Sequence, residues 1–172
     1  MKICPLADVA EAIPLLARWF NNEWQAFDGR STSVIEDQLA QNVNRDSVPI
    51  TFVALDDSTI LGTISLDHSD LPSHDHLSPW LASLYVRPTA RGAGIGSALV
   101  RHLQKFAVSR GCGPLYLWTP GATRLYERCG WTIIHRTTYN SQPITIMCFT
   151  NGSETPEKLQ AIAGCSRAPD RP

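Results

Sequence analysis

Hydrophobic residues recur at helical spacing in the first part of the chain. Apolar side chains three and four positions apart predict a helix over residues 9–19, which Asp8 would cap and Pro14 would kink. A second helix is expected to begin at Ser33, and the polar stretch 21–32 is expected to link the two. This part of the chain therefore predicts a pair of amphipathic helices.

Strand-like patterns dominate the rest of the chain. β-branched and aromatic runs separated by turn residues predict one hairpin turned at 56–58 and another at 140–141. Amphipathic spacing over 97–110, ended by Gly111, predicts a long helix, and 122–129 predicts a shorter one. The predicted strands cover residues 2–5, 50–55, 59–66, 80–87, 115–119, 131–138 and 144–149.

The composition predicts one globular domain. Of 172 residues, 43% are hydrophobic and 18% are charged, which is enough apolar surface for a core. Residues 1–150 carry the periodic pattern, whereas 151–172 lack periodicity and are expected to form a disordered tail. The chain meets Asp8 before any long apolar run, and no stretch is long enough to cross a bilayer. We therefore expect a cytoplasmic protein that does not enter the membrane.

Cysteine and histidine spacing gives no pattern for a disulfide framework or a metal. The five cysteines lie singly, without a Cys-x-x-Cys pair, and are expected to be reduced thiols. His74 and His76 stand two positions apart in a polar loop, but no third ligand follows at a known spacing. We therefore predict no metal site.

The net charge of −1 hides an asymmetry. Residues 1–86 contain 4 basic and 12 acidic side chains, whereas residues 87–149 contain 8 basic and 1 acidic. This split indicates a basic half that handles an anionic ligand and an acidic half that attracts a cationic one. Solvated helix faces that segregate by sign would give the same counts. Nucleic-acid binding is not favoured, because the chain as a whole is slightly acidic.

A glycine-rich segment, residues 91–97, stands between a predicted buried strand and a predicted helix. Its glycines allow a ligand to approach the backbone, and the free N–H groups at a helix start favour an anion. A Walker A loop does not fit, because no lysine follows Gly96, and a dinucleotide fingerprint does not fit, because Ser97 stands where its third glycine belongs. The segment therefore predicts a phosphate or pyrophosphate site of another kind.

This segment resembles motif A of the GCN5-related N-acetyltransferases (GNAT), Arg/Gln-x-x-Gly-x-Gly/Ala, which Arg91, Gly94 and Gly96 match. Residues 125–131, Leu-Tyr-Glu-Arg-Cys-Gly-Trp, resemble a second motif of that family, Phe/Leu-Tyr-x-x-x-Gly-Phe/Trp. The resemblance is sharp over 80–149 and implies an α/β acyl-CoA N-acyltransferase fold. Such a fold has a mixed, mostly antiparallel sheet of about seven strands flanked by helices, splayed beside one strand to admit pantetheine.

Carried over by position, the resemblance implies an acetyl-CoA site and direct transfer of the acetyl group to an amine in a ternary complex. The Leu84 N–H would face the thioester carbonyl. Tyr126 would protonate the departing thiolate, with a buried structural tyrosine as the alternative reading. The residues implied to bind acetyl-CoA are Leu84, Tyr85, Val86, Arg91, Gly92, Ala93, Gly94, Ile95, Gly96 and Ser97.

The general base departs from the pattern of histone-acetylating relatives, because Trp80 stands where they carry a glutamate. An amine acceptor with a pKa of about 10 must lose a proton before it attacks. Asp67, at the end of the neighbouring predicted strand, is the expected base. His68, Asp70 or a water chain leading to these residues are the alternatives.

The acceptor is expected to bind against the acidic first half of the chain. Glu23 and Asp28 are candidates to attract a cationic amine, and Trp19, Trp24 and Trp80 are candidates for an aromatic wall. A small cationic amine would fit, as would the N-terminus or a lysine of a peptide. A catalytically silent acyl-CoA-binding regulator is the other class, and the presence of a candidate acid favours catalysis over it. Monomer and homodimer both stay open.

Overall fold

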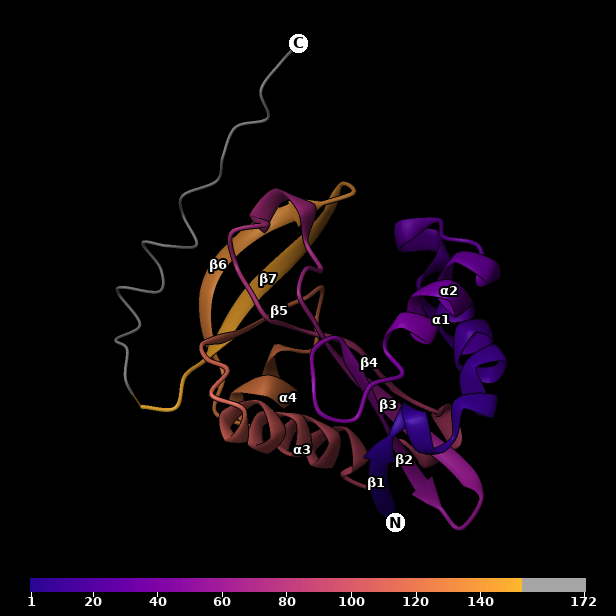
Figure 1. Cartoon of the computed structure of the whole chain (residues 1–172). Coiled ribbons are helices and arrows are strands. Elements are labelled where there is room, and N and C mark those ends of the chain that lie inside the picture. Colours follow the sequence, from indigo (N-terminus) through magenta and orange to yellow (C-terminus); the bar gives the residue numbers. More distant parts are fainter. Residues whose placement is uncertain (153–172) are drawn as a thin grey trace.

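The structure, a computed structural model, describes residues 1–152 apart from the side chains at positions 26 and 28. Within this part of the chain a seven-stranded sheet runs in the order β1-β2-β3-β4-β5-β7-β6, with helices on both faces (Figure 1). Neighbouring strands are antiparallel except for β4 and β5, which confirms the predicted mixed sheet. The strands are β1 (Lys2–Pro5), β2 (Ile50–Asp56), β3 (Thr59–Asp67), β4 (Trp80–Val86), β5 (Leu115–Thr119), β6 (Thr132–Tyr139) and β7 (Gln142–Phe149).

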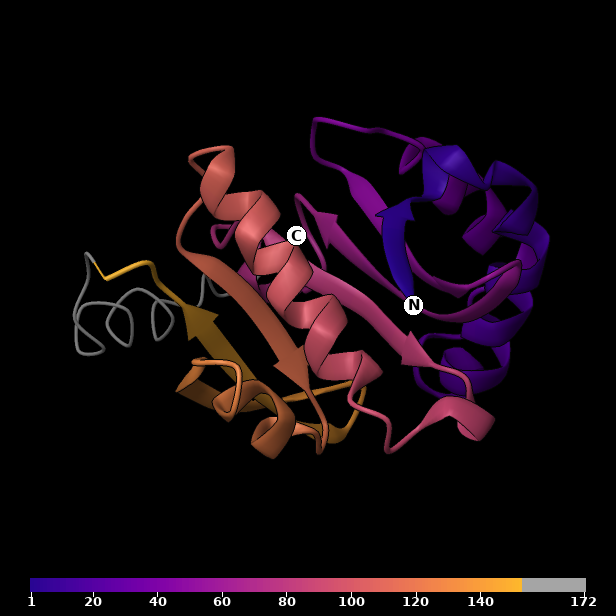
Figure 2. The same ribbon diagram turned by 90° about the horizontal axis from the view of Figure 1, so that it is seen from below.

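Four α-helices flank the sheet in the described residues. The first two lie together on one side, and the third lies across the other side (Figure 2). They are α1 (Ile13–Asp28), α2 (Thr32–Gln41), α3 (Ile95–Ser109) and α4 (Thr123–Glu127). Short 3-10 turns cover Leu6–Asp8, Ala10–Ala12, Pro72–His74 and Pro88–Ala90.

Strand alternation places a hydrophobic core on each face of the sheet. Phe52 of β2 belongs to the core beneath α3, with the fully buried Leu99 and Leu103. The next residue, Val53, belongs to the core beneath α1 and α2, with Leu16. Each such buried side chain stabilises the fold by about 1.5–3 kcal/mol, so the two faces hold the sheet in a fixed position between the helices.

The sheet opens between its two central strands. β4 and β5 pair at Trp80 and Tyr116, and the Tyr116 N–H donates to the Pro79 carbonyl at 3.0 Å. Trp80 is fully buried at this junction, and its indole N–H donates to the Leu77 carbonyl at 2.6 Å. Beyond the junction the strands separate, so the C-terminal half of β4 lies along an opening in the sheet.

The start of α1 differs from the sequence-based prediction. Two 3-10 turns occupy the residues before it, and the helix begins at Ile13 rather than near residue 9. Pro14 therefore lies in the first turn, where a missing N–H costs no hydrogen bond, and the predicted kink is wrong. Asp8 ends a 3-10 turn and does not cap the helix.

The predicted linker is also wrong, because α1 continues through residues 21–28. Trp24 and Phe27 extend its apolar stripe across a stretch whose other residues are mostly polar. α2 is capped by Ser31 rather than Ser33. The Ser31 hydroxyl accepts a hydrogen bond from a backbone N–H of the first helical turn at 3.4 Å.

The remaining predicted elements are confirmed to within two residues at each end, including the hairpin turned at residues 140–141. The tail predicted from residue 151 lies, from 153 onward, outside the described residues. None of the helices described is both long enough and apolar enough to traverse a bilayer. No disulfide joins the cysteines that the structure describes, Cys4, Cys112, Cys129 and Cys148.

Candidate active site

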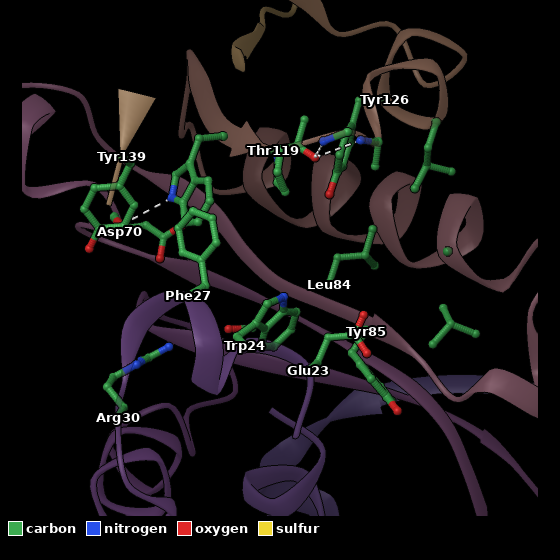
Figure 3. Close-up of a pocket in the computed structure, with 18 of the residues that line it drawn as sticks. Glu23, Trp24, Phe27, Arg30, Asp70, Leu84, Tyr85, Thr119, Tyr126 and Tyr139 are labelled. Atoms are coloured by element: carbon green, nitrogen blue, oxygen red, sulfur yellow. Dashed lines mark hydrogen bonds between the residues drawn. The ribbon is translucent and has the colours of Figure 1, made fainter. Parts of the chain in front are cut away.

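A cavity of about 900 Å³ opens where β4 and β5 separate. Its walls come from α1, the ends of β4 and β5, the start of α4 and the end of β6 (Figure 3). Arg91 and Gly96 line one end, and Leu84 and Tyr126 lie further in. The cavity thus brings together residues of both sequence motifs.

The first end of the cavity is built from main chain at the start of α3. Gly92 and Gly94 have φ values of 83° and 78°, which glycine adopts without strain, and Gly94 is the N-cap of the helix. The first N–H groups of a helix lack an intrahelical acceptor. Gly96 lines the cavity, and a Cβ added there would lie 3.8 Å from Val86 and 3.7 Å from Leu125. This arrangement suits an anion held by backbone donors.

Of the residues predicted to bind acetyl-CoA, some line the cavity and others do not. Ala93 is exposed in the glycine turn, and Ser97 is half-buried in the first turn of α3. The Ile95 side chain is buried in the core beneath α3, so only its main chain can reach a ligand. The predicted residues that line the cavity are Leu84, Tyr85, Val86, Arg91 and Gly96.

Arg91 lies beside the main chain of β4. Its Nε donates to the Val86 carbonyl at 2.9 Å, and its guanidinium stands 5.8 Å from the centre of the Tyr85 ring. A terminal nitrogen lies 3.4 Å from a carboxylate oxygen of Glu23 on α1. Both partners of this ion pair are about half exposed, so the pair is weak and screened by salt. The guanidinium is therefore available to another anion.

A β-bulge interrupts β4 inside the cavity. Tyr85 pairs with Thr63 and Ala82 pairs with Ser65, so the two residues Ser83 and Leu84 stand opposite a single residue of β3. Ser83 adopts a φ of 52°, unusual for a residue other than glycine. Both bulge residues line the cavity. The bulge therefore redirects the main chain where the Leu84 N–H is predicted to meet a thioester carbonyl.

Tyr126 lies on α4 and lines the cavity, although only 6% of its surface is exposed. Burial, followed by the charges of Asp70 and Cys129, raises the pKa of its phenol well above the ordinary value. The hydroxyl of Thr119 accepts hydrogen bonds from two backbone N–H groups of the turn before α4, at 3.3 and 3.0 Å. Tyr126 is thus a fixed and fully protonated hydroxyl at neutral pH.

The three candidate bases occupy different surroundings. Asp67 is buried and does not line the cavity, and its carboxylate accepts a hydrogen bond from Asn42 at 2.7 Å. Burial raises the pKa of Asp67 to about 6, against the opposing effect of Asn42. His68 is exposed, and its Nε2 lies 3.1 Å from the Val48 carbonyl. Asp70 lines the cavity, so it is the candidate that the fold brings to the site.

The acceptor residues expected from the sequence are only partly brought together. Glu23 and Trp24 line the cavity, whereas Trp80 is fully buried in the core and cannot form its wall. Trp19 packs on the Tyr85 ring with 5.2 Å between the ring centres. The side chain of Asp28 lies outside the described residues.

Sequence reasoning missed three aromatic residues that line the far end of the cavity, Phe27, Trp118 and Tyr139. Phe27 falls in the stretch predicted to be a linker, and Trp118 and Tyr139 belong to separate strands. Spacing along the chain gives no signal that these rings meet. The helical spacing from Trp24 to Phe27 was the available sign that α1 continues.

The histidines of the loop after β3 form a small cluster outside the cavity. The rings of His74 and His76 lie 5.8 Å apart, and His135 lies 5.9 Å from His74. In residues 1–152, no three His, Cys, Asp or Glu side chains are grouped so as to hold a metal ion.

Residues 13–131 match the model of the Acetyltransferase (GNAT) family. The chain belongs to this family. A thialysine N-epsilon-acetyltransferase of Bos taurus is 36% identical over 55 residues, which are 30% of this chain and 32% of the bovine protein. The chain thus matches about a third of the length of this curated relative.

Solved structures of GNAT enzymes share the fold. An aminoglycoside 6'-acetyltransferase type Ii superposes with a TM-score of 0.69 at 22% identity, covering 90% of this chain and 100% of that protein. An aminoglycoside 6'-N-acetyltransferase complexed with coenzyme A gives a TM-score of 0.65 at 20% identity, covering 90% and 99%. At these identities the likeness establishes the fold. The expected GNAT architecture is therefore confirmed.

Proposed function

We propose that the protein transfers the acetyl group of acetyl-CoA to a primary amine of a small cationic molecule, in a ternary complex. The cavity that joins the two family motifs supports this proposal most directly. The glycine turn at the start of α3 lies at one end, and the bulge at Leu84 and the phenol of Tyr126 lie further in. Three aromatic side chains lie beyond them. A thioester and an amine can therefore meet inside one cavity.

The cofactor would lie along β4 with its pyrophosphate at the start of α3. Backbone N–H groups around Gly92, Gly94, Gly96 and Ser97 would bind the phosphates, with Arg91 beside them. Residues 84–86 would pair with the pantetheine arm as though it were an added strand, because β5 has separated from β4 at this point. Family membership and the coenzyme A complex of a related fold support this placement.

The reaction needs an attacking amine, a stabilised oxyanion and a proton for the leaving thiolate. The amine nitrogen would attack the thioester carbon, and the Leu84 N–H would donate to the oxygen that becomes negative. The carbon–sulfur bond would then break, and Tyr126 would protonate the CoA sulfur. Burial raises the pKa of Tyr126, so the hydroxyl is protonated at neutral pH and can donate to the sulfur as negative charge develops there.

The proton of the amine would pass to a carboxylate at the end of β3 or in the loop after it. Asp67 is the base expected from the sequence, but Asn42 binds its carboxylate away from the cavity. Asp70 lines the cavity, and its charge acts on Tyr126. We therefore place Asp70 before Asp67 as the proton acceptor.

The proposal is tested by incubating the protein with acetyl-CoA and a small amine or short peptide, and by measuring the released CoA by chromatography. Replacing the acid by Tyr126→Phe is expected to lower kcat by roughly a hundredfold or more, while the affinity for acetyl-CoA stays unchanged. Equal turnover by both proteins would remove Tyr126 from the mechanism. A wild-type protein that binds acetyl-CoA but modifies no amine would favour an acyl-CoA-binding regulator, and one that does not bind acetyl-CoA would refute the proposal.

A further inference from the structure

Three aromatic rings from three separate elements pack together at the far end of the cavity. The ring centres of Phe27 and Trp118 lie 5.2 Å apart, and those of Phe27 and Tyr139 lie 5.7 Å apart. Trp118 and Tyr139 complete the triangle at 5.6 Å. All three rings are half-buried and line the cavity, so part of each ring remains open to a ligand. We call these three residues the aromatic enclosure.

The aromatic enclosure is tied together by hydrogen bonds. The amide of Asn140 donates to the Phe27 carbonyl at 2.8 Å, which holds the end of α1 against the β6–β7 hairpin. The Trp118 indole N–H donates to the Asp70 carbonyl at 3.3 Å, which holds the loop after β3 against β5. The walls from both halves of the sheet are therefore held in one geometry.

A carboxylate and a guanidinium lie at this end of the cavity. Asp70 lies beside Phe27 and Tyr139 in Figure 3 and places a carboxylate next to the rings. The guanidinium of Arg30, which also lines the cavity, donates to the side chain of Gln38. Aromatic faces attract an ammonium group, and the attraction increases where water is excluded. The rings and the carboxylate together form a surface suited to an organic cation.

An ammonium group bound at the aromatic enclosure cannot be the nitrogen that attacks the thioester. The thioester is expected beside Leu84 and Tyr126, and in Figure 3 the side chains of Phe27 and Tyr139 lie apart from both of these residues. An amine positioned for attack therefore leaves the aromatic enclosure to another part of the same molecule.

We propose that the aromatic enclosure binds a second ammonium group of the acceptor, which makes the substrate a small diamine or polyamine. The inference rests on the proposed function, because it requires that acetyl-CoA occupies the other end of the cavity. It goes further by assigning acceptor selection to Phe27, Trp118 and Tyr139.

The test compares acceptors of equal chain length on the wild-type protein: an alkyl monoamine, the matching diamine, the monoamine with a terminal trimethylammonium group, and a short peptide with a free N-terminus. The diamine and the trimethylammonium compound are expected to show kcat/KM at least about tenfold above the monoamine, because both carry a distal cation for the rings. A preference for the diamine alone would assign selection to a carboxylate and overturn the role of the rings. Equal values for all amines, or preference for the peptide, would overturn the inference.

A ring variant provides the second arm of the test. Tyr139→Leu is expected to remove the tenfold advantage while the kcat/KM of the monoamine and the affinity for acetyl-CoA change little. Phe27→Leu serves in its place if Tyr139→Leu does not fold. An equal loss with every acceptor would show that the rings only shape the cavity. Failure of the proposed function would be seen separately, as absence of acetyl-CoA binding or of turnover with any amine.

Discussion

The two ends of the cavity are built by different means. Main chain forms the end proposed for the cofactor: a glycine turn, the first N–H groups of α3 and the bulged edge of β4. Side chains form the end proposed for the acceptor, and they come from α1, the loop after β3, β5 and β6. A main-chain site depends little on which side chains the sequence carries, while a side-chain site can be altered one residue at a time.

The largest effect on cofactor binding is expected from changing the main-chain end at Gly94. In Gly94→Ala, a Cβ would strain a backbone with a φ of 78° and crowd the donors at the start of α3. We expect the Kd for acetyl-CoA to rise roughly ten- to a hundredfold, the loss of one charge-assisted hydrogen bond or slightly more. Isothermal titration calorimetry measures this change.

Gly111→Ala is the matched control for this substitution. Gly111 has a φ of 70° and lies just beyond the other end of α3, and its added Cβ also meets no atom within 4 Å. The two variants are expected to lose similar stability, of about 1–2 kcal/mol, but only the first should lose affinity for acetyl-CoA. A similar loss of affinity in both would mean that strain alone, not blocked donors, weakens binding.

A smaller effect is expected at the same end from Arg91→Gln. The guanidinium is exposed and already shares its charge with Glu23, so we expect the Kd for acetyl-CoA to rise about fivefold at low salt and less at high salt. Arg110→Gln is the control, because Arg110 also pairs with an acidic side chain but lies at the far end of α3. An effect that does not depend on salt would show that Arg91 acts by packing on Tyr85 rather than by charge.

The smallest effect on activity is expected from Asp67→Asn, which changes stability instead. Burial raises the pKa of Asp67 from its ordinary value of 3.8 to about 6, so its contribution to stability is complete below pH 3.8 and is lost as pH rises through 6. Asp67→Asn should therefore raise the free energy of unfolding relative to the wild type, and this gain should be about 2–3 kcal/mol larger at pH 7.5 than at pH 4. Urea unfolding at the two pH values measures the difference.

Asp57→Asn is the control for this change, because Asp57 is exposed in the β2–β3 turn, where asparagine tolerates its φ of 51°. It should show no such dependence on pH. A fall in kcat of a hundredfold in Asp67→Asn would return this residue to the role of base and extend the acceptor end of the site beyond the cavity.

The same contrast explains what the sequence could predict. Gly92 and Gly94 leave a mark in the sequence because a positive φ favours glycine, so the main-chain end was located from a short motif. Phe27, Trp118 and Tyr139 look like ordinary apolar positions of a helix and two strands. Only the tertiary fold brings them together, so no local pattern predicts their meeting.

Asp70 and Asp67 show a related limit. Both come after the strand predicted over residues 59–66, and Asp67, the nearer of the two, was the base expected from the sequence. The fold turns Asp67 towards Asn42 and carries Asp70 on into the cavity. The direction of a side chain at a strand end depends on register, which periodicity alone leaves undetermined at the last residue.

The hydrogen bond between Asn140 and Phe27 joins residues 113 positions apart in the chain. Closing so long a loop costs more entropy than closing the segment from β4 to α4, which contains the whole proposed cofactor end. The terminal hairpin must form before the end of α1 can be fixed against it. We therefore expect the more local contacts of the cofactor end to form before the aromatic enclosure closes.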